Sequence, residues 1–155
     1  MTKIIPLSKG KRAIVDDADF ERLAAFKWFY HSRGYAVRNL YSPNKGVMLM
    51  HRQILCGPAS MDTDHINGDK LDNRRCNLRI ATRADNIHNV GRRSSNTSGF
   101  KGVDWQKKCS KWRARVFVNG RERHVGYFDS PEDAAVAYNS AASEHYGEFA
   151  RLNDV

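Results

Sequence analysis

Apolar and polar residues alternate over short stretches of the first fifty residues, a pattern that predicts short β-strands around one helix. The predicted strands are residues 3–7, 12–15, 35–38 and 47–50. Asp16 or Asp17 would cap a helix over residues 20–26. Large apolar side chains in this region would form its core, namely Phe20, Leu23, Trp28 and Met50. We therefore expect a small, β-rich N-terminal region.

The middle of the chain predicts a strand, a turn and a helix in succession. Residues 64–65 would end a strand, and the dipeptide Asn67-Gly68 would form a tight hairpin turn. A second strand, residues 77–80, would follow after an excursion of the chain. The segment 82–85 has the form of a helix capping box, so a helix is expected from about Arg83 to about Val90.

A change of composition separates the last third of the chain. Residues 91–99 contain no large apolar side chain and have glycine at both ends, which is typical of a linker. Beyond it, three runs predict strands, with Asn119-Gly120 as a hairpin turn between the last two: 100–106, 111–118 and 121–128. Ser130 and Pro131 would begin a helix that Gly147 ends.

Alternation along the middle strand of this last third places one set of residues on a packing face and another on a cationic face. The packing face would hold Trp112, Ala114, Val116 and Val118, and the opposite face Arg113, Arg115 and Phe117. The helix has an apolar stripe that would cover the packing face, formed by Ala135, Tyr138, Ala141, Ala142 and Tyr146. The predicted fold class is therefore α+β, ending in a three-stranded antiparallel sheet packed on one helix.

The net charge of +9 and the pI near 9.7 favour a polyanionic partner. On charge alone, DNA, RNA and an anionic membrane surface all remain possible. Arg33, Arg38 and Lys45 in the N-terminal region would either contact such a partner or form a solvated face over the core. Because no apolar run approaches ~18 residues and the N-terminus lacks the core of a signal peptide, we expect a cytoplasmic protein with no membrane partner.

The three cysteines are far apart and odd in number: Cys56, Cys76 and Cys109. This arrangement predicts free thiols, because it fits neither a disulfide framework nor paired zinc ligands. A zinc-stabilised nucleic-acid adaptor is therefore disfavoured.

The segment from Asp64 to Asn86 carries the residues that single-metal phosphodiester cleavage requires. Asp64 and Asn86 would supply hard oxygen ligands for Mg²⁺, and His65 can take a proton from water near neutral pH. Taken in isolation, an Asp-His pair is more often a buried structural histidine beside a turn-capping aspartate. Asn77 has a structural interpretation as well, as a loop cap.

The sequence DHINGDKLDNRRCNLRIATRADN, from Asp64 to Asn86, resembles the HNH endonucleases of the phage and intron-encoded (homing) group, and so do residues 50–52 before it. The resemblance implies a ββα-metal fold over residues 51–91, with one Mg²⁺ or Mn²⁺ per active site bound by Asp64 and Asn86. It also implies His65 as the general base and Asn77 as the residue that holds the loop. Asn86 stands where the plain motif has histidine, which favours Mg²⁺ or Mn²⁺ over softer metals. It leaves the roles of His51 and His88 open.

Residues 99–155 resemble the ethylene-response-factor (apetala-type) DNA-binding domain, with residues 92–98 as the linker and 1–50 as the separate N-terminal region. The matching segments are 99–103, 111–114, 126–129, 132–135, 137–138 and 152–153. The resemblance implies that the sheet binds DNA. Asp104 and His124 stand where that family has arginine and tryptophan, so phosphate binding carries over more safely than base specificity. The candidate DNA contacts of this domain are Lys107, Lys108, Arg113, Arg115, Arg121 and Arg123.

Together these features predict a DNA endonuclease that nicks double-stranded DNA, hydrolyses a phosphodiester with a histidine base, and is targeted by a C-terminal domain. Further phosphate clamps near the catalytic motif would be Arg74, Arg75 and Arg79. One active site per chain is expected in a monomer or weak dimer, in the cytoplasm of a bacterial or phage-infected cell. The alternative is a DNA-binding transcriptional regulator whose nuclease core no longer cuts. The recognition sequence does not follow from these patterns.

Overall fold

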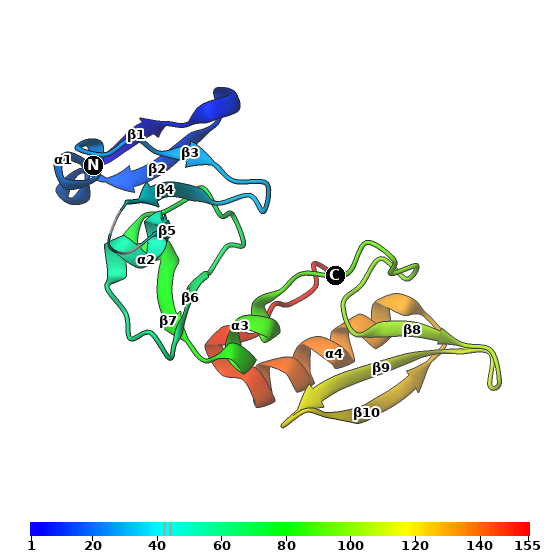
Figure 1. Ribbon diagram of the computed structural model, residues 1–155. Helices are drawn as coiled ribbons and strands as arrows, with labels where there is room; N and C mark the ends of the chain where they lie inside the picture. Colours follow the sequence, from blue (N-terminus) through cyan, green and yellow to red (C-terminus); the bar gives the residue numbers. More distant parts are fainter. Residues whose placement is uncertain (42, 44) are drawn as a thin grey trace. The chain divides into compact units, whose positions relative to one another are not determined.

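The structure, a computed structural model, describes residues 1–41, 43 and 45–155. The chain separates into two compact units, residues 1–86 and 87–155, each with its own hydrophobic core. The predicted α+β class is confirmed, because small antiparallel sheets alternate with helices and the last helix packs on a three-stranded sheet (Figure 1). No helix in the described residues is long and apolar enough to cross a membrane.

The first unit begins with two small sheets. Strands β1 (Thr2–Pro6) and β2 (Arg12–Asp16) pair with each other, joined by the 3₁₀ turn η1 (Ser8–Gly10), and helix α1 (Asp17–Ala24) follows. The second sheet contains β3 (Phe29–Tyr30), β4 (Ala36–Leu40) and β5 (Gly46–Leu49). Leu23, Trp28 and Met50 are buried as predicted, while Phe20 is partly buried at the edge of the core.

Helix α2 (Met50–Leu55) differs from the sequence prediction, which placed a strand over residues 47–50 and no helix after it. The strand ends at Leu49, and Met50 begins the helix with no side-chain cap. Cys56 ends the helix in the left-handed region, with φ of 49°. A helix of six residues without a polar N-cap carries too little local signal to be recognised.

The segment that carries the predicted site folds as two strands and a helix. Strands β6 (Asp62–His65) and β7 (Leu78–Ala81) pair antiparallel, and helix α3 (Arg83–Asn89) follows. The predicted capping box is confirmed: Thr82 Oγ1 accepts from the Asp85 N–H, and Asp85 Oδ2 accepts from the Thr82 N–H. Between the strands, residues 66–77 form a loop that begins with a turn at Gly68, whose φ is +79°, and ends in the 3₁₀ turn η2 (Arg75–Asn77).

Two backbone hydrogen bonds join this loop to strand β2. The Ile14 N–H donates to the Leu71 carbonyl at 2.8 Å, and the Asn73 N–H donates to the Ile14 carbonyl at 2.8 Å. The hydrophobic core of the unit includes residues from Ile5 to Leu78, so the N-terminal strands and strand β7 share one core. The N-terminal strand β2 therefore holds the loop through backbone hydrogen bonds.

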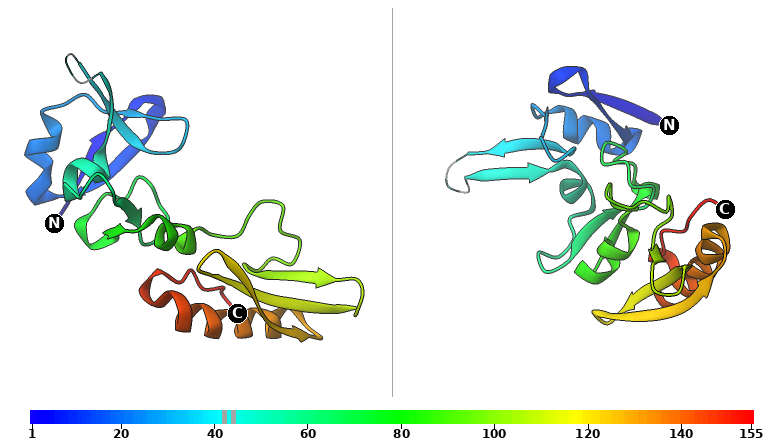
Figure 2. Two further views of the ribbon diagram at one scale, coloured as in Figure 1. Left: turned by 60° about the horizontal axis from the view of Figure 1, so that its bottom comes forward. Right: turned by 90° about the vertical axis from the view of Figure 1, so that its right-hand side faces the viewer.

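The second unit contains a meander of β8 (Val103–Gln106), β9 (Lys111–Val118) and β10 (Arg121–Phe128), followed by α4 (Pro131–Tyr146) and the 3₁₀ turn η3 (Gly147–Phe149). Figures 1 and 2 show α4 lying along one face of this sheet. The predicted packing is confirmed by the buried side chains of both layers, which are Val103, Ala114, Val116, Ala134, Ala135, Tyr138 and Ala142.

The hairpin turn and the helix cap of the second unit lie where the sequence predicts them, whereas the first strand begins later than predicted. Asn119 and Gly120 both have positive φ, 51° and 74°, as a tight hairpin turn requires. The Ser130 side chain caps α4 by accepting from the Asp133 N–H. Strand β8 begins at Val103 rather than residue 100, because Gly102 has φ of +75° and interrupts the extended backbone before it.

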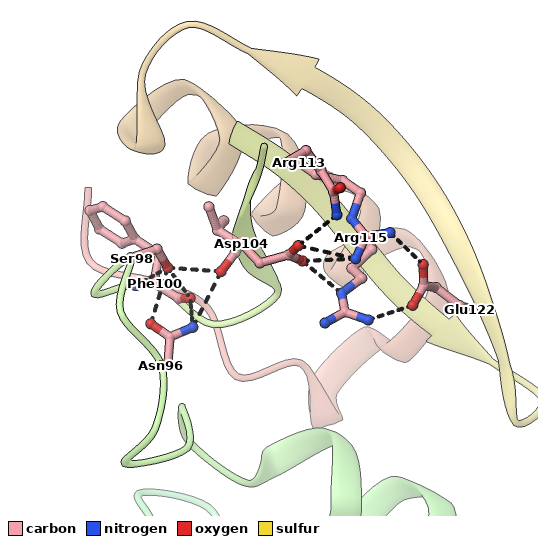
Figure 3. A network of polar contacts seen from close by, with 9 residues as sticks. Asn96, Ser98, Phe100, Asp104, Arg113, Arg115 and Glu122 are labelled. Carbon is pink, nitrogen blue, oxygen red and sulfur yellow. Dashed lines mark hydrogen bonds and ion pairs between the residues drawn. The ribbon is translucent and has the colours of Figure 1, made fainter. Parts of the chain in front are cut away.

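Part of the predicted linker belongs to the fold of the second unit (Figure 3). Ser98 Oγ donates to the Val103 carbonyl at 2.8 Å, and Asn96 Nδ2 donates to the Phe100 carbonyl at 2.9 Å. Asn96 Oδ1 also accepts from the Gly99 N–H. Asn96 and Ser98 thus supply the hydrogen bonds that the backbone of residues 99–103 does not make in a helix or strand. This role explains why polar residues occur in a segment whose composition is typical of a linker.

Candidate functional site

The strand pair β6–β7 positions the two central residues of the predicted site. Asp64 lies opposite Arg79 and His65 opposite Leu78 in the antiparallel register. Both Asp64 and His65 are only 5% exposed. Two polar side chains at this depth need hydrogen-bonding or charged partners, and the surrounding residues supply them.

His65 contacts Asn73 on the loop. Its Nε2 lies 3.4 Å from Asn73 Oδ1, and Asn73 Nδ2 donates to the Leu71 carbonyl. Burial lowers the pKa of His65 below its usual 6.5, while the hydrogen bond to Asn73 and the charge of Asp64 act in the opposite direction. Asn73, which was not among the predicted site residues, is 1% exposed, and its contact with Nε2 restrains the orientation of the imidazole.

Two further rings surround His65. The His51 ring packs edge-on against it with centroids 4.9 Å apart, and Tyr35 lies 5.2 Å from His51 and 6.1 Å from His65. Burial, together with the nearby His65 and Arg52, lowers the pKa of His51 to about 3. His51 is therefore neutral at pH 7 and packs beside the imidazole of His65.

Asn77 joins the two ends of the loop. Its Oδ1 accepts from the Asn67 N–H at 3.0 Å, and its Nδ2 donates to the Asp72 carbonyl at 2.8 Å. Its own carbonyl accepts from the Ile66 N–H, directly after His65. These contacts hold the backbone that carries His65 against the start of β7.

Asp64 is bound by the arginine opposite it. Arg79 Nε and Nη2 lie 3.0 and 2.8 Å from Asp64 Oδ2, and the Arg79 side chain is 11% exposed. A cation bound by Asp64 must share this carboxylate with Arg79 or displace its guanidinium. Arg79, predicted as a phosphate clamp, thus lies at the predicted metal ligand itself.

Asn86 lies on α3 and reaches strand β6. Its Nδ2 donates to Asp62 Oδ2 at 3.0 Å, and this bond is the main reason why the pKa of Asp62 lies below its usual value. Asp62 and Asp64 are two residues apart on one strand, so their side chains share a face. The sequence analysis did not single out Asp62, although the spacing of two from Asp64 was visible.

The donor chemistry of this face fits a hard divalent cation. In the described part of the chain, no group of three or more histidine, cysteine, aspartate or glutamate side chains could hold a metal ion. The predicted set of one carboxylate and one amide oxygen is smaller than such a cluster. Oxygen-only donors with room for water suit Mg²⁺ or Mn²⁺ better than zinc.

The other two arginines near the motif have carboxylate partners within the unit. Arg74 forms a two-pronged ion pair with Asp72, at 2.7 and 2.5 Å. Arg75 binds Asp19 on α1 at 2.7 and 2.9 Å, and its N–H donates to Asp16. Arg75 therefore ties the loop to the N-terminal helix. Arg38, considered for a partner surface, stacks over Phe26.

On the sheet of the second unit, Arg113 and Arg115 form a closed network with two carboxylates (Figure 3). Arg113 lies 3.1 Å from Asp104 and 3.0 Å from Glu122. Arg115 lies 2.9 Å from Asp104 and is also paired with Glu122. Two positive and two negative charges offset each other, so this part of the predicted cationic face is close to neutral.

The remaining four predicted DNA contacts are exposed. Lys107 and Lys108 lie on the β8–β9 turn, and Arg121 and Arg123 lie on β10. Within the residues that the structure describes, none of these four forms an ion pair. Arg121 and Arg123 pair with Val118 and Val116, which belong to the packing face, so these two arginines lie on the opposite face of the sheet from the ion-pair network.

His88, whose role the sequence left open, stacks on Tyr146 of α4, with ring centroids 3.8 Å apart and an interplanar angle of 11°. The partly buried ammonium of Lys101 donates to the His88 carbonyl. Burial lowers the pKa of Lys101 to about 8. Both contacts lie within the second unit, where His88 serves packing.

Comparisons with known proteins match the segment that contains the predicted site. Residues 57–88, which contain Asp64, His65, Asn77 and Asn86, match the family model described as HNH endonuclease. The chain is 34% identical over 155 residues to a protein of Acanthamoeba polyphaga mimivirus described as an uncharacterised HNH endonuclease, covering 95% of this chain and 77% of that protein.

A second relative is Protein 3.8 of Escherichia phage T7, 36% identical over 95 residues that cover 61% of this chain and 78% of that protein. No solved structure matches the chain with significance. The match to the mimivirus protein spans nearly the whole chain, and the family model covers the strands, loop and helix that hold the candidate site. The chain therefore belongs to the HNH endonuclease family.

Proposed function

We propose that the protein cuts double-stranded DNA with one divalent ion, Mg²⁺ or Mn²⁺, held by Asp64 and Asn86, and with His65 as the general base. The observation that carries this proposal is the buried, neutral His65 directly after Asp64 on β6. A base with a pKa at or below neutral pH is unprotonated when it meets its water.

Asn73 decides which nitrogen of His65 is basic. The Asn73 amide nitrogen is committed to the Leu71 carbonyl, so the atom facing His65 Nε2 is an oxygen that can only accept. Nε2 therefore carries the proton, and Nδ1 is the nitrogen that takes a proton from water. Asn77 supports this step by holding the backbone on both sides of the loop.

A divalent ion held by Asp64 and Asn86 would supply charge neutralisation for the phosphodiester. His65 would take a proton from a water that attacks the phosphorus opposite the 3′-oxygen. The bond from phosphorus to the 3′-oxygen breaks and this oxygen takes a proton from solvent, so the products are a 5′-phosphate and a 3′-hydroxyl. Arg74 and Arg79 lie close enough to the motif to exchange their carboxylate partners for DNA phosphates. One site per chain predicts a nick in one strand unless two chains combine.

The second unit is proposed as the targeting domain of a phage or mobile-element (homing) nuclease. Its resemblance to the ethylene-response-factor domain supports a sheet that binds DNA. Phosphate contacts are assigned mainly to Lys107, Lys108, Arg121 and Arg123. Arg113 and Arg115 contribute less net charge because Asp104 and Glu122 offset them.

The alternative is a DNA-binding regulator that does not cut. The observation in its favour is the ion pair between Asp64 and Arg79, which competes with a metal for the carboxylate. Incubation of the purified protein with phage or host DNA, with Mg²⁺ and with chelator, separates the two. Metal-dependent breaks with 5′-phosphate ends support the nuclease, and binding without breaks at any metal concentration supports the regulator.

Substitution of the two ligands then tests the metal site. Asp64→Ala and Asn86→Ala should both lose activity, but Asn86 is a neutral ligand, so raised Mg²⁺ or added Mn²⁺ should restore part of its activity. Asp64→Ala should be restored less because the charge is lost. Full tolerance of both substitutions would remove the metal site from the proposal.

A further inference from the structure

The side chain of Asp62 contacts the amide of Asn86 across the face of β6 that also carries Asp64. The donor is Asn86 Nδ2 and the acceptor is Asp62 Oδ2, at 3.0 Å. Asp62 takes no part in the chemistry proposed above. Its position next to a candidate metal ligand raises the question of what it does there.

The chemistry of the two groups fixes the orientation of the amide. An ionised carboxylate can only accept hydrogen bonds, whereas an asparagine amide has one donating and one accepting end. The nitrogen of Asn86 must therefore face Asp62, and its oxygen must face away from it. A metal ligand needs this oxygen, so the carboxylate selects the one of two amide orientations that can bind a cation.

Asp62 is itself held in place by two arginines. Arg52 Nη2 lies 3.7 Å from Asp62 Oδ1, and Arg83 Nη1 lies 3.4 Å from Asp62 Oδ2. Arg52 also donates to the Met61 carbonyl at 2.7 Å, which anchors it beside the strand. Both cations favour the ionised carboxylate, the form that can only accept.

We propose that Asp62 is a positioning residue that orients the Asn86 amide so that its Oδ1 faces the metal site shared with Asp64. This inference rests on the proposed role of Asn86 as a ligand. Groups that orient a metal ligand typically contribute 10- to 100-fold to metal affinity without touching the metal. Replacement of Asp62 by Asn removes the selection, because an asparagine at this position can donate or accept.

The test measures Mn²⁺ binding by electron paramagnetic resonance and calorimetry on the full-length protein without DNA, so the readout does not depend on cleavage. Asp62→Asn should bind Mn²⁺ about 10- to 100-fold more weakly than the wild type. Asp17→Asn is the matched control: it removes the same charge from a surface carboxylate paired with Lys3 and should leave Mn²⁺ affinity unchanged.

A second background separates positioning from direct binding. In Asn86→Asp, both side-chain ends are oxygens, so orientation no longer matters. Asp62→Asn should then cause no loss of Mn²⁺ affinity, and it should relieve the repulsion between two adjacent carboxylates. An equal loss in both backgrounds would show that Asp62 binds the metal itself and would overturn the inference.

Two outcomes distinguish the inference from the proposed function. If the wild type binds Mn²⁺ and Asp62→Asn binds it equally well, the positioning role is wrong and the metal site stands. If the wild type shows no Mn²⁺ binding, the metal site and the inference both fail.

The side-chain amide resonances of Asn86 in the wild type provide a check that does not depend on how any variant folds. Slow exchange of these protons supports the bond to Asp62. Rapid exchange with water contradicts it.

Discussion

The two units of the chain place their candidate functional residues in opposite surroundings. In residues 1–86 the central groups Asp64, His65 and Asn77 are buried and bonded to neighbouring side chains and backbone. In residues 87–155 the candidate DNA contacts are exposed on a turn and an outer strand, or half-buried in an ion-pair network. We therefore expect that replacing one buried group lowers the cleavage rate strongly, whereas replacing one exposed cation lowers the affinity for DNA only slightly.

The cores differ in a related way. The first unit buries large apolar side chains and also, among the residues that the structure describes, eight polar or charged residues, several of them in or beside the loop between β6 and β7. The second buries mainly small side chains of α4, such as Ala134, Ala135 and Ala142, so the helix approaches the sheet closely. The buried polar groups of the first unit include the residues of the candidate site. The second unit has a sheet on which α4 packs closely through small side chains.

The largest expected effect is on catalysis by the first unit. His65→Ala should lower the cleavage rate by about 10²- to 10⁴-fold, because it removes the general base. Affinity for DNA should hardly change, since the base acts in the transition state. Rates and affinities should be measured beside His145→Ala, an exposed histidine on α4. Cleavage at the wild-type rate by His65→Ala would refute its assignment as the base.

A large effect on folding is expected in the second unit. A Cβ at Gly102 would lie 2.1 Å from the Tyr138 ring, and φ is +75°. Gly102→Ala should therefore destabilise this unit by roughly 2 kcal/mol or more. Gly91→Ala is the control, since a Cβ there meets nothing within 4 Å. Equal melting temperatures for the two variants would contradict the close packing of α4 on the sheet.

A fall in pH should lower the free energy of unfolding of the first unit because of His51. Because its pKa in the folded protein is about 3, below the usual 6.5, the unfolded chain binds a proton at a pH where the folded chain does not. This stability is fully present above pH 6.5 and is lost as the pH falls toward 3, by up to about 1.4 kcal/mol for each pH unit.

Urea unfolding between about pH 7 and pH 5 tests this, with His51→Gln as the variant that no longer titrates. The wild type should lose stability more steeply than the variant as the pH falls. Parallel curves for the two proteins would show that the His51 ring does not remain neutral in the folded state.

The smallest single effects are expected for the exposed cations of the second unit. Replacing Lys107, Lys108, Arg121 or Arg123 by Gln should each lower the slope of log affinity against log salt by about 0.9. Combined replacement of Arg113 and Arg115 should lower it by less than twice that, because their charge is already offset. Binding can be titrated in the His65→Ala background, which does not cut.

Lys3→Gln is the control for this series, because Lys3 is a surface lysine of the first unit and its replacement removes one charge outside the second unit. If Lys3→Gln changes the salt slope as much as the Lys107 and Arg123 substitutions do, the second unit has no special role in binding.

The sequence predicted elements whose signals are local. Strands 111–118 and 121–128 and the helix from Arg83 agree with the structure because alternation, an Asn-Gly turn and a capping box each act within a few residues. Helix α2 was missed because it is short and has no polar cap. Its first residue was assigned to the preceding strand instead.

The partners of the site residues could not be predicted, since they come from distant parts of the chain. Asp62 meets Asn86 over 24 positions, and Arg75 meets Asp19 over 56. Arginines expected to face DNA, such as Arg79 and Arg113, lie against carboxylates on neighbouring strands. Residue type and spacing indicate which groups are chemically suited to a site, while the fold decides which of them meet.

The central claim is that the first unit cuts and the second only targets. Its most direct test is conversion of supercoiled plasmid by three proteins, with Mg²⁺ and with chelator: the wild type, His65→Ala, and a variant with Gln at Lys107, Lys108, Arg121 and Arg123. We expect Mg²⁺-dependent nicked circles from the wild type and none from His65→Ala. The four-fold variant should give nicks at higher protein concentration with altered positions. Cleavage that persists in chelator and in His65→Ala would contradict the account.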